Sequence, residues 1–231
     1  MNTKSGLLLY VSILLLSSSV SLARTLVLLQ ESDVNIELIS GPPEPFGPED
    51  LFDLGIVVGA QMNRTKEQCD LWDKRSKMAI ADIFMSVPGL ISNEEIKSVR
   101  GIVLAVLSDT KYFEENLKKR FARPRPFERT AEIHPCVSHS VSNSFPSGHA
   151  SVSRAMANVL GDLFPDKKEA LLQQSDQVAL ERVLGGVHHP KDIEAGKALG
   201  DLVFQAYLKN EKYLKCRLER SYCNRLDLIA K

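Results

Sequence analysis

The sequence has no excess of either charge, because its 231 residues include 29 lysines and arginines and 29 aspartates and glutamates. Proteins that bind nucleic-acid polymers usually carry a basic balance or a basic stripe, so we expect no nucleic-acid partner. Beyond an N-terminal run, no stretch is long and apolar enough to cross a bilayer, and we expect no stable membrane span. No internal repeat or low-complexity tract divides the chain, which predicts a single domain.

The first 23 residues have the pattern of a cleavable secretory leader. Lys4 precedes an apolar run at residues 6–16, and Ser21 and Ala23 place small residues at the −3 and −1 positions of a cleavage site. We predict a signal peptide over residues 1–23, cleaved after Ala23, and a periplasmic or secreted mature protein. An uncleaved membrane anchor is the alternative, because residues 26–29 continue the apolar run after the interruption at Arg24.

The cysteines lack the C-x2-C spacing typical of structural zinc sites, although Cys136 lies between His134 and His139. An even number of cysteines in an exported chain predicts disulfides instead, and the candidates are Cys69, Cys136, Cys216 and Cys223. The sequence leaves three pairings open, as well as buried free thiols. If Cys216 pairs with Cys223, the chain between them cannot be one straight helix, because seven helical residues separate two Cα atoms by about 10 Å.

Residues 24–60 contain seven acidic residues and one arginine, interrupted by prolines and glycines, and we expect an extended N-terminal segment packed on the domain. From residue 61 onward the apolar residues recur at helical spacing. This spacing predicts helices around residues 71–84, from a capping box at Ser92 to about residue 120, and over about 149–163, 166–183 and 190–213. We therefore expect residues 61–231 to form an all-α, single-domain bundle with a central helical core, whose helical faces could support a homodimer.

Three short motifs concentrate the chemistry, and the first is basic and rich in proline. It contains Lys118, Arg123 and Arg125, with a proline after each arginine. Proline disfavours helix in the residue before it, so both arginines should lie on an extended turn beyond the helix that carries Lys118. A guanidinium on a stiff backbone can present paired donors to phosphate oxygens. A solvated basic helix end is the alternative interpretation.

The second motif runs from Pro146 to His149 and precedes a run of small residues at helical spacing. Ser147 is a plausible N-cap for that helix. The free backbone N–H groups of such a helix end attract anions, and Gly148 lets an anion approach because it has no side chain. His149 would lie beside the bound anion, although a surface histidine next to a structural turn has the same pattern.

The third motif contains Arg182, His188 and Asp192. Pro190 fits the first turn of a new helix. The four-residue spacing across this corner can bring the Asp192 carboxylate to one ring nitrogen of His188. The other nitrogen would then be free as a nucleophile. A helix cap with an exposed pair of histidines is the alternative.

The three motifs read K-x6-R-P from Lys118, P-S-G-H from Pro146 and R-x5-H-x3-D from Arg182. In this order and spacing they closely resemble the signature of the type 2 phosphatidic acid phosphatase superfamily, which includes the vanadium haloperoxidases. The leader, the size and the lack of further spans resemble the class A bacterial non-specific acid phosphatases within it. The superfamily usually has serine where this chain has Glu181, which could weaken one phosphate hydrogen bond or simply point elsewhere.

This resemblance implies an acid phosphatase that hydrolyses small-molecule phosphate monoesters without a metal or another cofactor. His188 would attack phosphorus to form a phosphohistidine, Asp192 would hold its imidazole, and His149 would protonate the leaving alcohol and later activate water. No catalytic role is expected for His134, His139 or His189, and His189 should begin a helix. The phosphate oxygens would be bound by Lys118, Arg125, Ser147, Gly148, His149 and Arg182.

Proteins with other activities carry similar motifs. A phosphatase that prefers lipid phosphates such as phosphatidic acid shares them, as does a vanadate-dependent haloperoxidase, and a helical module that binds phosphate without turnover is the non-enzymatic alternative. We expect an acidic pH optimum, because phosphate and carboxylate near His149 would favour its charged form. Nothing in the sequence specifies the alcohol part of the substrate.

Overall fold

The structure is a computed structural model that describes residues 26–225. Over these residues the chain forms α-helices and short 3-10 turns without a strand, so the all-α prediction is confirmed. None of the helices in this part of the chain combines the length and apolarity needed to cross a membrane. The predicted leader at residues 1–23 lies outside the described residues.

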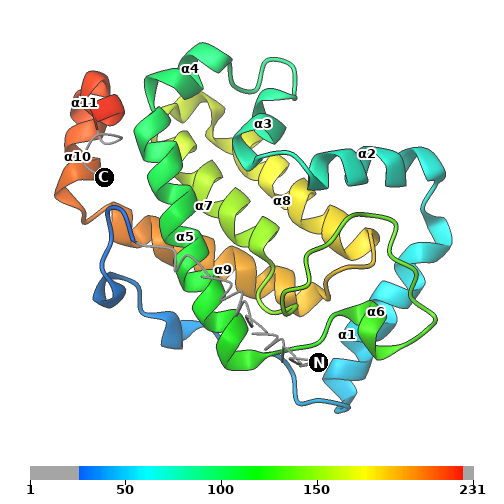
Figure 1. The fold of residues 1–231 in the computed structure, drawn as a ribbon. Helices are drawn as coiled ribbons and strands as arrows, with labels where there is room; N and C mark the ends of the chain where they lie inside the picture. Colours follow the sequence, from blue (N-terminus) through cyan, green and yellow to red (C-terminus); the bar gives the residue numbers. More distant parts are fainter. Residues whose placement is uncertain (1–25, 226–231) are drawn as a thin grey trace, which may run out of the picture.

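Four long helices build the centre of the molecule: α5 (Arg100–Phe121), α7 (Gly148–Leu163), α8 (Lys168–Leu184) and α9 (Pro190–Tyr207). Figure 1 shows α7 in the middle of this group, packed against the other three. Its residues are almost all buried, because small side chains such as Ala155 and Ala157 let the neighbouring helices surround it. The main hydrophobic cluster runs through α7 and extends from Leu28 to Cys223.

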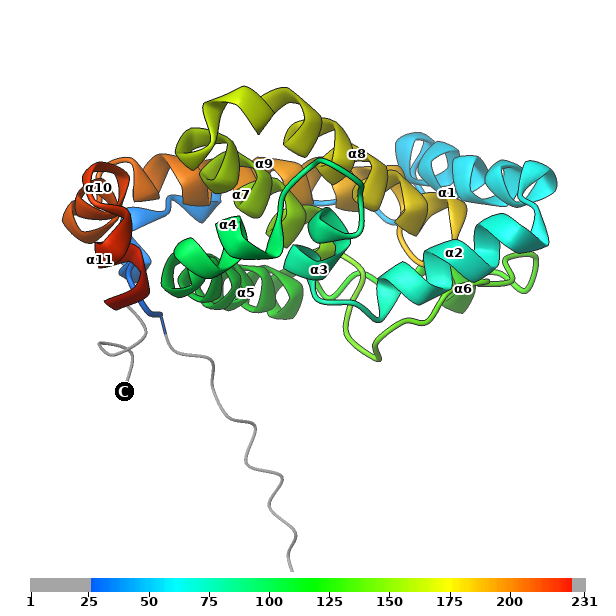
Figure 2. The ribbon, with the colours of Figure 1, turned by 90° about the horizontal axis from the view of Figure 1, so that it is seen from above.

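Shorter helices lie at the two ends of the molecule (Figure 2). One end carries α1, α2 and α6, and the opposite end carries α10 and α11. Their bounds, with those of α3 and α4, are α1 Pro48–Ala60, α2 Lys66–Ser76, α3 Ile80–Met85, α4 Asn93–Ser98, α6 Pro126–Arg129, α10 Glu211–Leu218 and α11 Arg220–Arg225. The 3-10 turns cover Glu31–Asp33, Ile36–Leu38, Gln61–Asn63 and Pro165–Lys167.

The prediction of an extended segment over residues 24–60 is wrong over its last 13 residues, because residues 48–60 form helix α1. Gly47 is the N-cap and Pro48 occupies the first turn, where a missing N–H costs nothing, and Glu49 and Asp50 suit the positive end of the helix dipole. Pro48 therefore begins a helix here and does not interrupt one. Residues 26–47, here called the N-terminal strap, do run along the domain.

The strap is attached through a buried carboxylate of α5. Backbone N–H groups of Val27, Leu28 and Leu29 donate to Asp109 over 2.5–3.3 Å, and the Tyr207 hydroxyl donates to it at 2.7 Å. Burial raises the pKa of Asp109, and these hydrogen bonds oppose that rise. The strap is therefore held by its main chain.

Several predicted helices are divided in two. The helix expected around residues 71–84 consists of α2 and α3, and the helix expected over 190–213 ends at Tyr207. A new helix, α10, begins there because the Asn210 side chain accepts hydrogen bonds from the next turn. The capping box at Ser92 is confirmed at the start of α4, but Val99 leaves helical geometry between α4 and α5.

The cysteines form two disulfides, Cys69–Cys136 and Cys216–Cys223. The second pair has a Cα–Cα distance of 4.8 Å, and Glu219 between its two cysteines is extended, so that α10 and α11 are separate helices as the sequence required. All four cysteines are paired, which removes both the zinc alternative and the free-thiol alternative.

The main chains of helices α7 and α9 are in direct contact near the start of each helix. A Cβ atom on Gly196 of α9 would lie 2.7 Å from the Ser147 carbonyl oxygen, closer than real Cβ atoms come. The Ser147 N–H also donates to the Asp192 carbonyl at 2.8 Å. Glycine at position 196 therefore sets the separation between the start of α7 and the start of α9, which carry the second and third motifs.

Candidate active site

The first motif sends its two arginines in opposite directions. Helix α5 ends at Ala122, whose left-handed conformation (φ 47°) turns the chain, and residues 123–126 continue without helix until α6. Arg125 reaches into a cavity, as predicted for a phosphate ligand. Arg123 instead points away from that cavity to a group of buried carboxylates.

The cavity has a volume of about 360 Å³ and lies between α2, α5, α7, α8 and the loop at residues 138–142. The sequence predicted that three cations, one glycine and two histidines would meet, and all six line it: Lys118, Arg125, Gly148, His149, Arg182 and His188. Asp192 lies behind His188. Ser147, which was also predicted to bind phosphate, does not line the cavity. It caps α7, and its Oγ accepts a hydrogen bond from the Ala150 N–H at 3.5 Å.

The three cations of the cavity are almost fully buried, with 3–6 % of their surface exposed. Burial lowers the pKa of Lys118 to about 8, against an opposing effect of Glu114, and lowers the pKa of Arg182 to about 10 with help from the Arg125 charge. Arg182 Nε has no hydrogen-bond partner. A bound anion would accept a hydrogen bond from this buried donor, and it would offset the three neighbouring positive charges.

The His188 ring is held from both sides. Arg125 lies 3.2 Å from Nε2, and Asp192 Oδ2 lies 3.3 Å from Nδ1. A guanidinium can only donate hydrogen bonds, so Nε2 carries the lone pair and Nδ1 carries the proton. Burial and the neighbouring cations lower the pKa of His188 and keep the ring neutral. Nε2 is therefore an available nucleophile within the cationic cavity.

Asp192 is fully buried and accepts hydrogen bonds from several donors. Ser144 Oγ lies 2.5 Å and the His189 N–H 2.8 Å from Oδ2, and Arg123 donates to Oδ1 at 2.8 Å. Burial alone would raise the pKa of this carboxyl, but the hydrogen bonds from His188 and His189 hold it well below its usual range. His189 is the N-cap of α9, as expected, and it also orients Asp192.

His149 stands at the N-terminus of α7, half-buried, with its ring hydrogen-bonded to the Ser76 backbone. Burial and the charges of Arg182 and Lys111 lower the pKa of His149 to about 3. The expectation of a charged ring concerns the site with phosphate beside His149. In the structure the neutral ring is favoured, chiefly because burial disfavours its charged form.

The sequence did not reveal the elements that close over this cavity. The loop at 138–142 accepts hydrogen bonds from both phosphate-site arginines, through Ser138 O to Arg182 at 3.0 Å and Ser142 O to Arg125 at 2.9 Å. Disulfide Cys69–Cys136 and a bond from the Ser138 N–H to Asp73 tie this loop to α2. The disulfide and the hydrogen bond to Asp73 join residues 67 and 65 positions apart, so no local sequence pattern predicts them.

Glu181, which replaces the usual serine of the superfamily, points away from the cavity lining. Its buried carboxylate forms an ion pair with Arg75 of α2 and accepts a hydrogen bond from Gln177 at 3.3 Å. The departure from the motif thus helps to hold α2 beside His149.

Two charged residues of α5 that were not among the predicted site residues also line the cavity. Lys111 pairs with Glu114 at 2.7 Å, and Glu114 lies 3.6 Å from Lys118. A Cβ atom on Gly148 would overlap the Glu114 carboxylate, so glycine is required there by close approach. The i, i+3, i+7 spacing of these three residues was the available signal.

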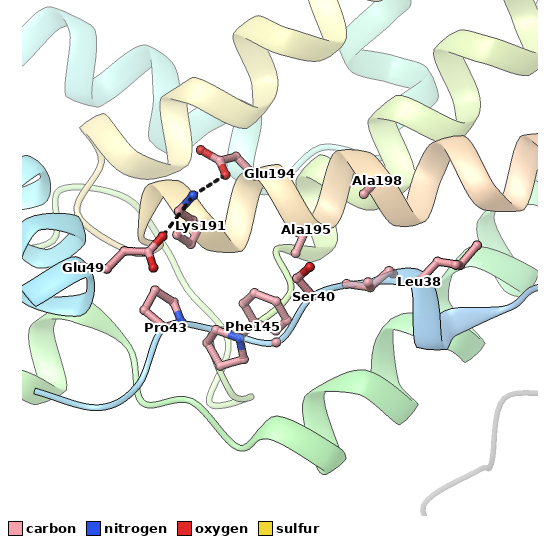
Figure 3. A pocket seen from close by; sticks show the side chains of 12 residues that line it. Leu38, Ser40, Pro43, Glu49, Phe145, Lys191, Glu194, Ala195 and Ala198 are labelled. Carbon is pink, nitrogen blue, oxygen red and sulfur yellow. Dashed lines mark hydrogen bonds and ion pairs between the residues drawn. The ribbon is translucent and has the colours of Figure 1, made fainter. Parts of the chain in front are cut away.

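A larger cavity of about 500 Å³ lies between the N-terminal strap and α9 (Figure 3). Phe145 lies against it, and Lys191 at its edge is bonded to Glu49 and Glu194. Its charged groups neutralise one another and none of the predicted catalytic residues lines it, so the smaller cavity has the chemistry of an active site.

Metal ligands are not clustered in this structure. Among residues 26–225, no group of three or more His, Cys, Asp or Glu side chains has an arrangement that could hold a metal ion.

Comparison with known proteins agrees with this geometry. A family model described as the PAP2 superfamily matches residues 99–215, which contain all three motifs. Over 190 residues the chain is 22 % identical to a non-specific acid phosphatase of Providencia stuartii, with 78 % of this chain and 77 % of that protein covered. It is 36 % identical over 90 residues to a lipid A 1-phosphatase of Rhizobium johnstonii, covering 37 % of each.

The fold is also similar to the crystal structure of a bacterial vanadium-dependent iodoperoxidase. The TM-score is 0.60 at 18 % sequence identity, and the alignment covers 78 % of this chain and 54 % of the other. At this identity the likeness concerns the fold alone. The family model, in contrast, covers half of the chain and includes the whole candidate site. The chain therefore belongs to the PAP2 superfamily.

Proposed function

We propose that this chain is an acid phosphatase that hydrolyses phosphate monoesters through a phosphohistidine on His188. The observation that carries the proposal is the orientation of the His188 ring, with Nδ1 on Asp192 and Nε2 on Arg125 inside the cationic cavity. Binding of a phosphate would give Arg125 phosphate oxygens in place of Nε2. The freed lone pair would then face phosphorus.

The reaction has two balanced steps. In the first, Nε2 of His188 bonds to phosphorus, the bond from phosphorus to the ester oxygen breaks, and His149 gives a proton to that oxygen. In the second, His149 takes a proton from water, the water oxygen bonds to phosphorus, and the bond from phosphorus to Nε2 breaks, which releases inorganic phosphate and restores the free His188 ring. Lys118, Arg125, Arg182 and the Gly148 N–H stabilise the charge on the transferring group in both steps, so the proposal includes no metal.

His149 must be charged to act as the acid, and its low pKa in the free site does not prevent this. The largest cause of that low pKa is burial, followed by the charges of Arg182 and Lys111. A phosphate dianion beside the ring opposes these cations and favours the protonated ring. Substrate binding thereby brings the acid into its active state.

Two observations support export and a soluble substrate. The two disulfides suit an oxidising compartment, consistent with the predicted leader at residues 1–23. The relative named as a non-specific acid phosphatase aligns with 78 % of this chain, whereas the lipid A 1-phosphatase aligns with 37 %. The second match makes lipid phosphates the competing substrate class.

The test is hydrolysis by the purified protein of phenyl phosphate and of phosphatidic acid in vesicles, from pH 4 to pH 8, with and without a chelator. We expect metal-independent hydrolysis of phenyl phosphate on the acid side of neutrality. Preference for the vesicles would assign the lipid class instead. Rapid quench into alkaline denaturant with a labelled phosphate ester should leave label on His188 in the wild type and none in His188→Ala, and label on Ser147 would overturn the mechanism.

A further inference from the structure

The active-site cavity contains a carboxylate where an anion is expected to bind. Glu114 is the one acidic side chain among the described residues that line this cavity, against four lysines and arginines. It is only 3 % exposed, and it forms ion pairs with Lys111 at 2.7 Å and with Lys118 at 3.6 Å. Two negative charges repel each other, so this carboxylate opposes the binding of an anion that carries no proton.

The Glu114 carboxylate faces the start of α7, where the Gly148 N–H is a predicted phosphate donor. A Cβ atom on Gly148 would lie 2.4 Å from Oε1 and 2.8 Å from Oε2 of Glu114, so the carboxylate occupies the space that a side chain would fill. Both residues line the same cavity. An oxyanion bound at this helix end is therefore bound beside the carboxylate.

Two buried polar atoms beside the cavity lack hydrogen-bond partners of opposite kinds. Oε2 of Glu114 is ion-paired with Lys111 but accepts no hydrogen bond in the part of the chain that the structure describes, and Nε of Arg182 donates none. An ionised carboxylate can only accept, and a guanidinium can only donate. An oxyanion that carries a proton has a donor for the first and acceptors for the second, whereas an oxyanion without a proton has acceptors alone.

We propose that Glu114 accepts a hydrogen bond from a protonated oxygen of the bound phosphate, so that the site discriminates between oxyanions that carry a proton and those that do not. The inference rests on the proposed phosphate site. The cations and the Gly148 N–H bind the ionised oxygens, and the P–OH group donates to Glu114. A phosphate ester binds with one proton, shared with Glu114, and its other oxygens still bring negative charge to His149. Glu114 is thus a specificity-determining residue outside the three motifs.

The experiment measures the dissociation constants of inorganic phosphate and of sulfate at pH 5 by titration calorimetry. At this pH phosphate is a monoanion that carries protons, and sulfate is a dianion of the same tetrahedral shape that carries none. The cations of the cavity alone would favour sulfate, because it has the higher charge. We expect the wild type to bind phosphate at least about tenfold more tightly than sulfate, the effect of one charge-assisted hydrogen bond.

Glu114→Gln should remove this preference. The amide has nearly the size of the carboxylate but no charge, and its NH2 group can donate to a sulfate oxygen, so sulfate should bind more tightly than it does to the wild type. Glu115→Gln is the matched control, because Glu115 is the next residue of α5 and does not line the cavity. This control should keep the wild-type ratio of the two dissociation constants.

An unchanged ratio in Glu114→Gln, with equal losses for both anions or with none, would overturn the inference and leave Glu114 as a support for Lys118. Equal affinities of the wild type for phosphate and sulfate would overturn it as well, and that result does not depend on the folding of any variant. A wild type that binds neither anion would instead overturn the proposed phosphate site.

Discussion

Arg123 donates a hydrogen bond of 2.8 Å to Oδ1 of Asp192, the carboxylate that holds the His188 ring. The other end of the same guanidinium donates to Asp50 and Asp53 of α1, also at 2.8 Å. All of these groups are at least 95 % buried. One arginine thus links the N-terminal helix to the carboxylate behind the proposed nucleophile.

Arg123→Ala should destabilise the protein by about 3–5 kcal/mol, because it leaves buried carboxylates without their counter-charge. Urea unfolding measures this loss. Arg123→Lys keeps the charge but cannot bond both α1 and Asp192 through a planar fork, so it should recover part of the stability and little of the kcat. A loss of less than 1 kcal/mol in the alanine variant would show that the carboxylates do not depend on this residue.

Binding of phosphate or vanadate at pH 5 should protonate His149. Free His149 is neutral at this pH because burial and nearby cations lower its pKa to about 3, and a bound oxyanion raises that pKa by opposing the cations. Titration calorimetry in buffers of different ionisation enthalpy measures the uptake. His149→Gln should take up fewer protons than the wild type, because any proton released by the anion is common to both proteins, and equal buffer dependence of the binding heat in the two proteins would contradict the assignment.

The two disulfides should differ in what their removal does. Cys69–Cys136 closes 67 residues and should contribute about 4 kcal/mol by chain entropy, whereas Cys216–Cys223 closes 7 and should contribute about 2 kcal/mol. The first also anchors the loop at 138–142, which bonds Arg125 and Arg182.

Replacing Cys69 and Cys136 with serine should therefore weaken phosphate binding as well as stability, because the loop would no longer be tied to α2 there. Replacing Cys216 and Cys223 provides the control, since that pair lies at the opposite end of the molecule (Figure 1). Unchanged phosphate affinity in the first variant would show that Asp73 alone holds the loop.

Glu181→Gln should destabilise the protein by roughly 1–3 kcal/mol, because it leaves the Arg75 guanidinium without its buried partner. The free energy of unfolding, measured with Arg75→Met and the double variant, gives the coupling between the two residues. We expect a coupling of at least 0.5 kcal/mol. Additive losses would mean that the ion pair does not hold α2 in place.

The acid stability of the active-site loop follows from Asp73, which accepts the Ser138 N–H. Hydrogen bonds from Lys77 and Ser138 lower the pKa of Asp73 to about 2. Because the pKa is depressed on folding, the stabilisation is present above the usual carboxyl range and is lost as the pH falls toward 2. The hydrogen-exchange protection of residues 138–142, taken relative to the intrinsic rate at each pH, should fall over that interval, and Asp73→Asn should be less protected than the wild type at pH 5.

The parts of the site that could be predicted are those whose partners are near in sequence. Ser147 and His189 were identified as helix-start residues, and the i, i+4 spacing brought His188 to Asp192. These contacts depend on helix geometry, which the sequence pattern specifies. The meeting of the three motifs was expected from their resemblance to a superfamily rather than from their spacing.

What could not be predicted depends on contacts between distant segments. Arg123 has the same local pattern as Arg125, yet its partners on α1 turn it away from the cavity. The role of Glu181 is invisible without Arg75, which is 106 residues away in the chain. Helix α1 was missed for a different reason, because a proline at the first turn begins a helix as readily as it breaks one.

The contact of Gly196 with the Ser147 carbonyl has a consequence for how this protein can vary. The acid at the start of α7 and the nucleophile just before α9 are spaced by main-chain atoms in contact, which have almost no freedom to compress. Substitutions among the large apolar side chains between the other helices can change the packing there without altering that spacing. The distance between the acid and the nucleophile therefore depends little on substitutions elsewhere in the core, but position 196 tolerates no side chain.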